Sequence, residues 1–162
     1  MPEALAPAFP DEPEAPIRKV VLTSAPKIRA VYWCNFWNDA LRPEFYKTRP
    51  VVVVSRDNRL DGPIIVVPLT TKPQGGNKWA HKLSENPIKK YRAIESWAIC
   101  NHLYTVSCAR LTQVDGGAPR LLQADFNAIV NLMFRSLPSP PVMIEAIMVE
   151  ASITEIEAVT DV

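Results

Sequence analysis

The stretch PVVVVS at residues 50–55, followed closely by IIVVPLT at residues 64–70, decides the fold class of this chain. Each is a continuous apolar run of strand length, which is typical of a strand covered on both faces. The sequence DGP at residues 61–63 has the composition of a turn. These segments predict two buried strands joined by a turn, with Pro68 marking an edge or a bulge near the end of the second strand.

Further strands are predicted on both sides of this pair, and one helix follows them. Residues 28–37 (IRAVYWCNFW) and 97–106 (WAICNHLYTV) have strand composition, and shorter strands are predicted at 17–23 and 79–83. In residues 119–136 the apolar positions recur at steps of three and four, which is typical of a helix that packs on a core. We therefore expect a mainly β fold, a small barrel of about five short strands plus one terminal α-helix.

Length and composition fit one domain with two dissimilar ends. The chain has 162 residues, of which 48% are hydrophobic and 22% charged, and this is enough for a single core. Residues 1–27 begin with a proline-rich stretch and are predicted to be a loosely tethered arm. Residues 28–136 form the predicted domain. Residues 137–162 are an acidic, apolar tail whose period does not distinguish helix from strand.

The composition also narrows the cellular context. No apolar run is long enough for a membrane-spanning helix, and the N-terminus has no signal-peptide pattern. Three cysteines cannot form a disulfide framework, and Cys34, Cys100 and Cys108 are predicted to be reduced thiols in strands. We expect a cytoplasmic protein with no membrane association.

The charge is divided along the chain. Residues 27–113 carry fourteen Lys/Arg and six Asp/Glu, a net charge of +8, whereas residues 137–162 carry five acids and no base. A basic middle indicates an anionic partner, although an ordinary solvated surface is an equally good interpretation of charge alone.

No motif of cofactor or metal chemistry is present. The sequence lacks GxxxxGK[ST], GxGxxG, GxSxG and HExxH, so we expect no nucleotide cofactor, no serine-hydrolase triad and no metal site. Two polar residues beside the apolar runs are better candidates. Arg49 lies between a polar loop and a strand, and its planar fork suits a phosphate group. Thr70 ends a buried strand at a basic loop, where threonine is more often a turn residue.

A basic segment with interleaved aromatic residues suggests nucleic-acid binding. Lysine supplies attraction for phosphates, and an aromatic ring can stack on an unpaired base. The residues expected to contact RNA are Lys47, Lys72, Asn77, Lys78, Trp79 and His81. A packing role is an equally good interpretation of Trp79, and Trp33 and Trp37 are predicted to lie in the core.

Four segments in order carry a family resemblance. FYKTRPVVVVS (45–55) resembles the K-x-RP-x-V-V-S segment of the MazF/PemK family of toxin endoribonucleases, and VVPLTT (66–71) resembles the strand end V-x-P-x-T-[TS] of that family. AVYW (30–33) is similar to the opening strand of the family, and residues 97–106 are similar to its V-x-C-D-Q-x-[RK]-[TS]-[IV] strand. The resemblance covers about residues 28–136.

The resemblance implies an SH3-like barrel of antiparallel strands that forms a homodimer, and a toxin of a type II toxin–antitoxin system with an antitoxin protein as partner. It implies cleavage of single-stranded RNA, such as mRNA, without a metal, by attack of a ribose 2′-hydroxyl that yields a 2′,3′-cyclic phosphate. Arg49 matches the catalytic arginine of the family and Thr70 its catalytic threonine. Glu44 lies where the first loop of the family carries an acidic residue, and is a candidate base.

Two departures from the family pattern leave alternatives open. The Asp-Gln pair of the family is Asn101-His102 here, and Ile99 stands where some members have an arginine. His102 is a candidate for the proton transfer, because histidine titrates near neutral pH; the alternative is an interface or strand residue. A catalytically weakened nucleic-acid- or protein-binding module is therefore the second interpretation. A gyrase poison of the CcdB type, which lacks the Arg-Pro and Thr pair, ranks last.

The acidic tail permits a further hypothesis. Residues 142–162 are acidic and apolar, so they would be able to inhibit the protein by covering its basic groove. Because they are covalently attached, their effective concentration at the groove would be roughly millimolar. An ordinary packing extension or a disordered segment is the alternative.

Overall fold

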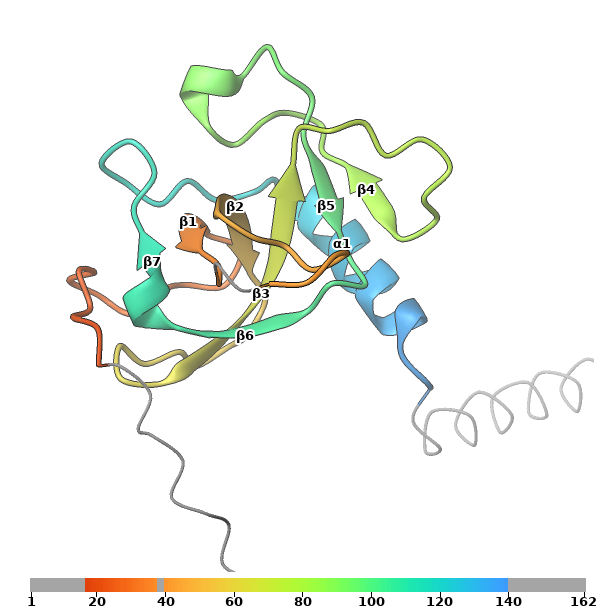
Figure 1. Cartoon of the computed structure of the whole chain (residues 1–162). Coiled ribbons are helices and arrows are strands. Elements are labelled where there is room, and N and C mark those ends of the chain that lie inside the picture. The colour runs from red at the N-terminus through yellow and green to blue at the C-terminus, as the bar shows by residue number, and fades with distance from the viewer. Residues whose placement is uncertain (1–16, 38–39, 140–162) are drawn as a thin grey trace, which may run out of the picture.

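The computed structural model describes residues 17–37 and 40–139, which form seven strands, two short 3-10 helices and one α-helix (Figure 1). The predicted arm at 1–16 and most of the acidic tail, 140–162, lie outside the described residues. In chain order the elements are β1 (Val31–Asn35), β2 (Thr48–Val53), β3 (Pro63–Thr70), β4 (Ala80–Lys82), η1 (Lys89–Tyr91), β5 (Trp97–Ile99), β6 (Tyr104–Ser107), η2 (Cys108–Arg110), β7 (Leu111–Thr112) and α1 (Gln123–Ser136).

The strands form one antiparallel sheet in the order β4-β5-β3-β2-β1-β7, and β6 also pairs with β3. The mainly β fold with a terminal helix is confirmed. The expected count of about five strands is corrected to seven, and the sheet is open rather than a closed barrel, since β4 and β7 end the order without pairing with each other among the described residues.

The predicted single strand over 97–106 is wrong, because the chain turns in its middle. The amide of His102 donates to the carbonyl of Ile99 at 3.1 Å, which closes a turn between β5 and β6. The two short strands then pair with different parts of β3, Leu69 opposite Ala98 and Val66 opposite Tyr104. Pro68 lies between these two pairings, so its missing N–H disrupts neither ladder. The proline is buried in the middle of the sheet, not at an edge.

The sheet has an apolar layer on each face, as the continuous apolar runs predict. Residues 51–53 are fully buried, and their side chains alternate between the two layers. Val52 belongs with Val31 and Val67 to the layer that also contains the helix residues. Val51 and Val53 belong to the opposite layer. Because both faces of β2 and β3 are packed, the ends of these strands are fixed in position. Side chains at these ends are therefore held in a defined place.

The helix starts four residues later than predicted. Residues 119–121 run beside β1 instead: the Val31 amide donates to the Pro119 carbonyl at 2.8 Å, and the Leu121 amide donates to the Arg29 carbonyl at 3.0 Å. These bonds hold 119–121 extended, so α1 begins only at Gln123. Among the described residues, no helix is long and apolar enough to cross a membrane.

The structure corrects two further predictions, the strand at 17–23 and the placement of all three cysteines in strands. Residues 17–23 form no strand, although Leu22 is buried against the layer that contains Val51. All three cysteines are free and buried, but only Cys34 lies in a strand; Cys100 follows β5, and Cys108 begins η2.

Candidate active site

A pocket of about 380 Å³ lies where β2 begins and β3 ends. Antiparallel pairing brings these two ends together: Val51 stands opposite Pro68, and Arg49 and Thr70, each two residues beyond this pair, line the same pocket. The loops before β2 and after β3, and the turn after β5, complete the walls. The lining residues include two cations and no carboxylate; they are Pro43, Phe45, Arg49, Thr70, Lys72, Gln74, Asn77, Ile99 and His102.

The guanidinium of Arg49 is only weakly engaged by the protein. Its Nε donates to the carbonyl of Tyr46 at 3.4 Å, which is long for a hydrogen bond. Its Cζ lies 6.0 Å from the centre of the Phe45 ring and 5.9 Å from that of Tyr46, and no ion pair of the described residues includes it. The remaining donors of this half-buried group are available to an anion in the pocket.

Thr70 presents a hydroxyl group that can still donate. The side chain is 7% exposed, and its Oγ1 accepts a hydrogen bond from the Lys72 amide at 3.1 Å. Because the backbone amide uses a lone pair of the oxygen, the hydroxyl hydrogen is left to point elsewhere, and a phosphate oxygen in the pocket would accept it.

His102 is held as a neutral imidazole. Burial lowers the pKa of this side chain below the usual 6.5, because the charged form loses its hydration. The ring packs edge-on against Phe45, with centroids 5.4 Å apart, and its buried Nδ1 has no hydrogen-bond partner in the described part of the chain. A neutral, half-buried imidazole beside an arginine is a competent proton acceptor near neutral pH.

An aromatic contact fixes the loop that forms one wall. The amide of Phe45 donates to the hydroxyl of Tyr104 at 2.9 Å, so β6 holds the loop before β2 in place. The Phe45 ring also meets the Tyr104 ring at a right angle, 6.4 Å between centroids. Neither aromatic residue was among the predicted site residues, although Phe45 lies directly beside the predicted Glu44. Tyr104 could be recognised only from its contact with the loop.

Glu44 lies outside this pocket. Its Oε2 accepts a hydrogen bond from the amide of Leu41 at 2.8 Å, and the side chain lines an adjoining pocket with Trp37 and Tyr104. The structure thus brings Arg49, Thr70 and His102 together in one pocket. It places Glu44, the fourth predicted catalytic residue, in the adjoining pocket.

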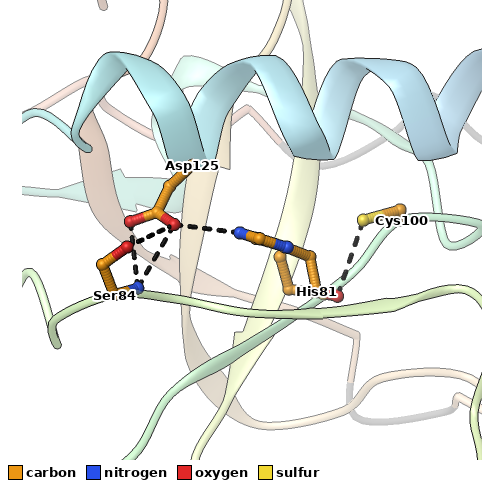
Figure 2. A network of polar contacts seen from close by, with 5 residues as sticks. His81, Ser84, Cys100 and Asp125 are labelled. Carbon is orange, nitrogen blue, oxygen red and sulfur yellow. Dashed lines mark hydrogen bonds and ion pairs between the residues drawn. The ribbon is translucent and has the colours of Figure 1, made fainter.

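His81 lies apart from the pocket, at a polar junction under α1 (Figure 2). Its Nε2 lies 2.9 Å from Oδ1 of Asp125, a helix residue that is 3% exposed. The same carboxylate accepts from the amide of Ser84 at 3.0 Å and from its hydroxyl at 3.0 Å. The side chain of His81 therefore ties β4 to α1, and the expected RNA contact is not supported by its position.

The other predicted RNA contacts divide between the pocket wall and its surroundings. Lys72 and Asn77 line the pocket, and the amide side chain of Asn77 shapes the loop by accepting from the Trp79 amide at 3.1 Å. Lys78 stands over the half-buried ring of Trp79, with Nζ 4.9 Å from the centroid, and neither residue lines the pocket. Lys47 is exposed just before β2, where its φ of 65° is left-handed.

The two departures from the family pattern fall at different places. Ile99 is 4% exposed and forms an apolar part of the pocket wall. Asn101 is exposed in the turn and is not a lining residue. No group of three potential metal ligands occurs among residues 17–37 and 40–139. The pocket thus offers an anion-binding arginine, a hydroxyl donor and an imidazole, which are suited to phosphate chemistry.

The fold is an open antiparallel sheet with a terminal helix, and its candidate site is a cationic pocket at the ends of two strands. Comparison with known proteins identifies the family of this chain. The sequence model of the PemK-like, MazF-like toxins of type II toxin–antitoxin systems matches residues 27–134. The chain therefore belongs to this family. No curated protein matches the sequence.

Solved structures of the same fold agree with this assignment. MazF from Deinococcus radiodurans superposes with a TM-score of 0.55 at 16% identity, covering 68% of this chain and 94% of its own. An endoribonuclease from a mycobacterial species gives 0.51 at 20%, covering 72% and 96%. A mycobacterial endoribonuclease in complex with its cognate antitoxin gives 0.53 at 20%, covering 72% and 100%. At these identities the likeness extends to the fold alone.

Proposed function

We propose that this chain is an endoribonuclease that cleaves single-stranded RNA, such as mRNA, in the cytoplasm. The 2′-hydroxyl of a ribose attacks the adjacent phosphate, the bond to the 5′-oxygen of the next nucleotide breaks, and a 2′,3′-cyclic phosphate and a 5′-hydroxyl remain. The observation that carries the proposal is that Arg49, Thr70 and His102 line one pocket.

Each side chain has a role that its surroundings favour. Arg49, whose donors are not used by a carboxylate, stabilises the negative charge that develops on the phosphorane. The hydroxyl of Thr70 donates to a phosphate oxygen. His102, whose pKa burial lowers, accepts the proton of the 2′-hydroxyl. We propose that these three groups act without a metal ion.

The test is incubation of the purified protein with a long single-stranded RNA in EDTA, with the product ends mapped. Discrete cuts with cyclic phosphate ends are expected. Arg49→Ala should slow cleavage by about 10²–10³-fold, because it removes the main donor to the phosphorane. Arg135→Ala is the matched control, since Arg135 is an exposed arginine in the last turn of α1. Uncut RNA with the wild-type protein would overturn the proposal.

A binding module without cleavage is the second candidate function. The observation that favours it is Ile99, a buried apolar side chain in the pocket wall at the position where some members of the family have an arginine. If the module only binds, Arg49→Ala should weaken RNA affinity modestly and no product ends should form at any enzyme concentration. The same assay therefore separates the two functions.

The same cleavage assay can also test whether the acidic tail inhibits the protein. The pocket contains Arg49 and Lys72 and no carboxylate, whereas residues 137–162 contain five acids and no base. Under the hypothesis of self-inhibition, a variant that ends at residue 137 cleaves RNA faster than the full chain. Equal rates for the two proteins would contradict self-inhibition without affecting the nuclease proposal.

Two protein partners are proposed from the family and its relatives: a second copy of the chain, and an antitoxin. Three large apolar side chains on and beside α1 support a protein interface, since Leu122, Phe134 and Leu137 are between 48% and 65% exposed. Light scattering coupled to size-exclusion chromatography should give the mass of a homodimer. A monomer at micromolar concentration would contradict this proposal.

A further inference from the structure

A second pocket adjoins the candidate active site, and the proposed chemistry does not use it. It has a volume of about 360 Å³ and is lined by Trp37, Ala40, Glu44 and Tyr104. The two pockets are separated by two short segments: Glu44 faces this pocket while its neighbour Phe45 lines the first, and Tyr104 lines this pocket while His102 lines the first. The two pockets therefore lie on either side of the same two segments.

The walls are aromatic rings that stay partly open to solvent. Trp37 is 36% exposed, contrary to its predicted place in the core, and its ring centroid lies 6.2 Å from that of Tyr104 at an angle of 37°. The Cζ of Arg110 lies 4.5 Å from the Trp37 centroid, and its Nη1 donates to the Asn35 carbonyl at 3.0 Å. The indole is thus held in position while part of its apolar surface has no cover, which favours stacking of a flat ligand.

Glu44 supplies a polar group with a defined orientation. Its Oε2 is fixed by the Leu41 amide at 2.8 Å, and no ion pair of the described residues engages the carboxylate. An ionised carboxylate only accepts hydrogen bonds and retains further lone pairs. A ligand of this pocket should therefore be a flat ring with N–H donors along one edge.

We propose that this pocket binds one unpaired nucleobase of the RNA, next to the phosphate held by Arg49, and that Glu44 selects guanine. Guanine offers two adjacent donors, N1–H and the N2 amino group, to a single carboxylate, whereas the other bases offer fewer. The inference rests on the proposed function and deepens it, since it names the base preference of the same site. Glu44 is then a specificity residue, in place of the predicted general base.

The position of the pocket favours a nucleotide over a protein side chain. The rings of His102 and Tyr104 lie 6.5 Å apart between centroids, so a base beside the bound phosphate reaches the Tyr104 side of the wall. Both pockets carry a nearby guanidinium, Arg49 in the first and Arg110 in the second, and these attract a phosphodiester chain.

Binding of oligodeoxyribonucleotides, which lack the attacking 2′-hydroxyl, tests the proposal independently of cleavage. The probes are fluorescein-labelled hexamers with 2′-deoxyribose at every position, so that none can be cleaved. Each carries guanine, inosine or adenine at one position, and the other five positions are deoxyuridine. Inosine lacks only the N2 amino group. The wild-type protein should bind the guanine probe about tenfold more tightly than the inosine probe, and Glu44→Gln should remove most of this difference. Glu85→Gln, a change at an exposed carboxylate that faces Arg92, is the matched control.

Trp37 gives a second readout through stacking. Trp37→Ala should weaken binding of all probes about tenfold, and Trp37→Phe should restore most of the affinity, because a phenyl ring still stacks. In the cleavage assay, Trp37→Ala should raise KM with little change in kcat, and Glu44→Gln should broaden the sequences at which cuts occur.

The outcomes distinguish the inference from the function on which it rests. Equal affinity of the wild-type protein for guanine and inosine, or an unchanged guanine preference in Glu44→Gln, would overturn the inference and leave cleavage untouched. A fall in kcat of Glu44→Gln with an altered pH profile would make Glu44 a general base and would also overturn it. Guanine selection by a wild-type protein that leaves RNA uncut would support the inference and reject the nuclease.

Discussion

Two polar regions of this molecule differ in how completely their groups are paired. At the junction under α1, the carboxylate of Asp125 accepts from His81 and from both donors of Ser84 (Figure 2). In the pocket at the ends of β2 and β3, Arg49 has one long contact to a carbonyl, and Nδ1 of His102 has no partner in the described residues. Buried polar groups are normally satisfied, so an unsatisfied cluster indicates a place for a ligand.

The comparison separates two histidines that the sequence placed in one functional region. The ring of His81 hydrogen-bonds to Asp125 and so helps to pack the helix on the sheet. His102 packs edge-on against Phe45 and lines the candidate site. The same residue type therefore joins the helix to the sheet in one region and lines the candidate active site in the other. Substitution of one histidine at a time tests this difference.

The largest effect is expected from His102→Gln compared with His81→Gln. His102→Gln should lower the rate of RNA cleavage by at least about a hundredfold, because glutamine cannot accept the proton. The wild-type rate should fall as the pH drops through the lowered pKa of His102, below 6.5, since the protonated imidazole is no longer a base. Stopped-time cleavage assays between pH 4.5 and 8 measure both effects.

His81→Gln is the matched variant in this experiment. Glutamine can still donate to Asp125, so the cleavage rate should stay within about twofold of the wild type. A rate loss in His81→Gln equal to that in His102→Gln, with an unchanged melting temperature, would place His81 in the chemistry and break the comparison.

The next effect concerns stability at the junction. Asp125→Ala should lower the free energy of unfolding by about 3 kcal/mol, because it leaves the Ser84 amide and the His81 ring without their acceptor. Urea denaturation followed by tryptophan fluorescence measures the change. Glu95→Ala is the control, since its partner Lys82 is exposed and a surface pair contributes at most about 1 kcal/mol. Equal costs in the two variants would show that burial at the junction adds nothing.

A third prediction concerns the buried thiols of Cys34 and Cys100. Burial raises the pKa of Cys34 to about 12 and that of Cys100 to about 11. Because the folded state keeps these protons while the unfolded state loses them near pH 9, the contribution of the two thiols to stability is constant below pH 9 and falls as the pH rises toward 12. Cys34→Ala should flatten this decline in pH-dependent urea titrations. An unchanged slope would exclude Cys34 as its source.

The smallest effect is expected at two exposed residues with left-handed backbone angles, one at each end of β2. Lys47 has a φ of 65°, and Asp57, in the β2–β3 connection, has a φ of 52°. Glycine adopts such angles without strain, so Lys47→Gly and Asp57→Gly should each change the free energy of unfolding by no more than about 1 kcal/mol, toward greater stability. Only Lys47→Gly should also reduce the salt dependence of RNA binding, by about one phosphate contact. An equal effect of both variants on RNA binding would exclude a specific role of Lys47.

The central strands could be predicted because their signal is local. The run VVV at 51–53 is apolar at every position, and a strand covered on both sides buries all of it. The turn in the middle of 97–106 could not be predicted in this way, since that segment reads as one strand. The chain turns there because β3 pairs with β6 through Val66 and with β5 through Leu69. These pairings join segments that are far apart in the sequence, so a local pattern cannot predict them.

The sequence by itself determined the class of fold, the family motifs and the place of Arg49 and Thr70 beside two apolar runs, because each depends on residues that are close together along the chain. The tertiary structure alone decided which histidine faces the pocket, that Glu44 and Trp37 share a pocket of their own, and that the helix begins at Gln123. These outcomes depend on which segments pair across the sheet, and pairing is governed by the burial of the whole molecule rather than by local propensity.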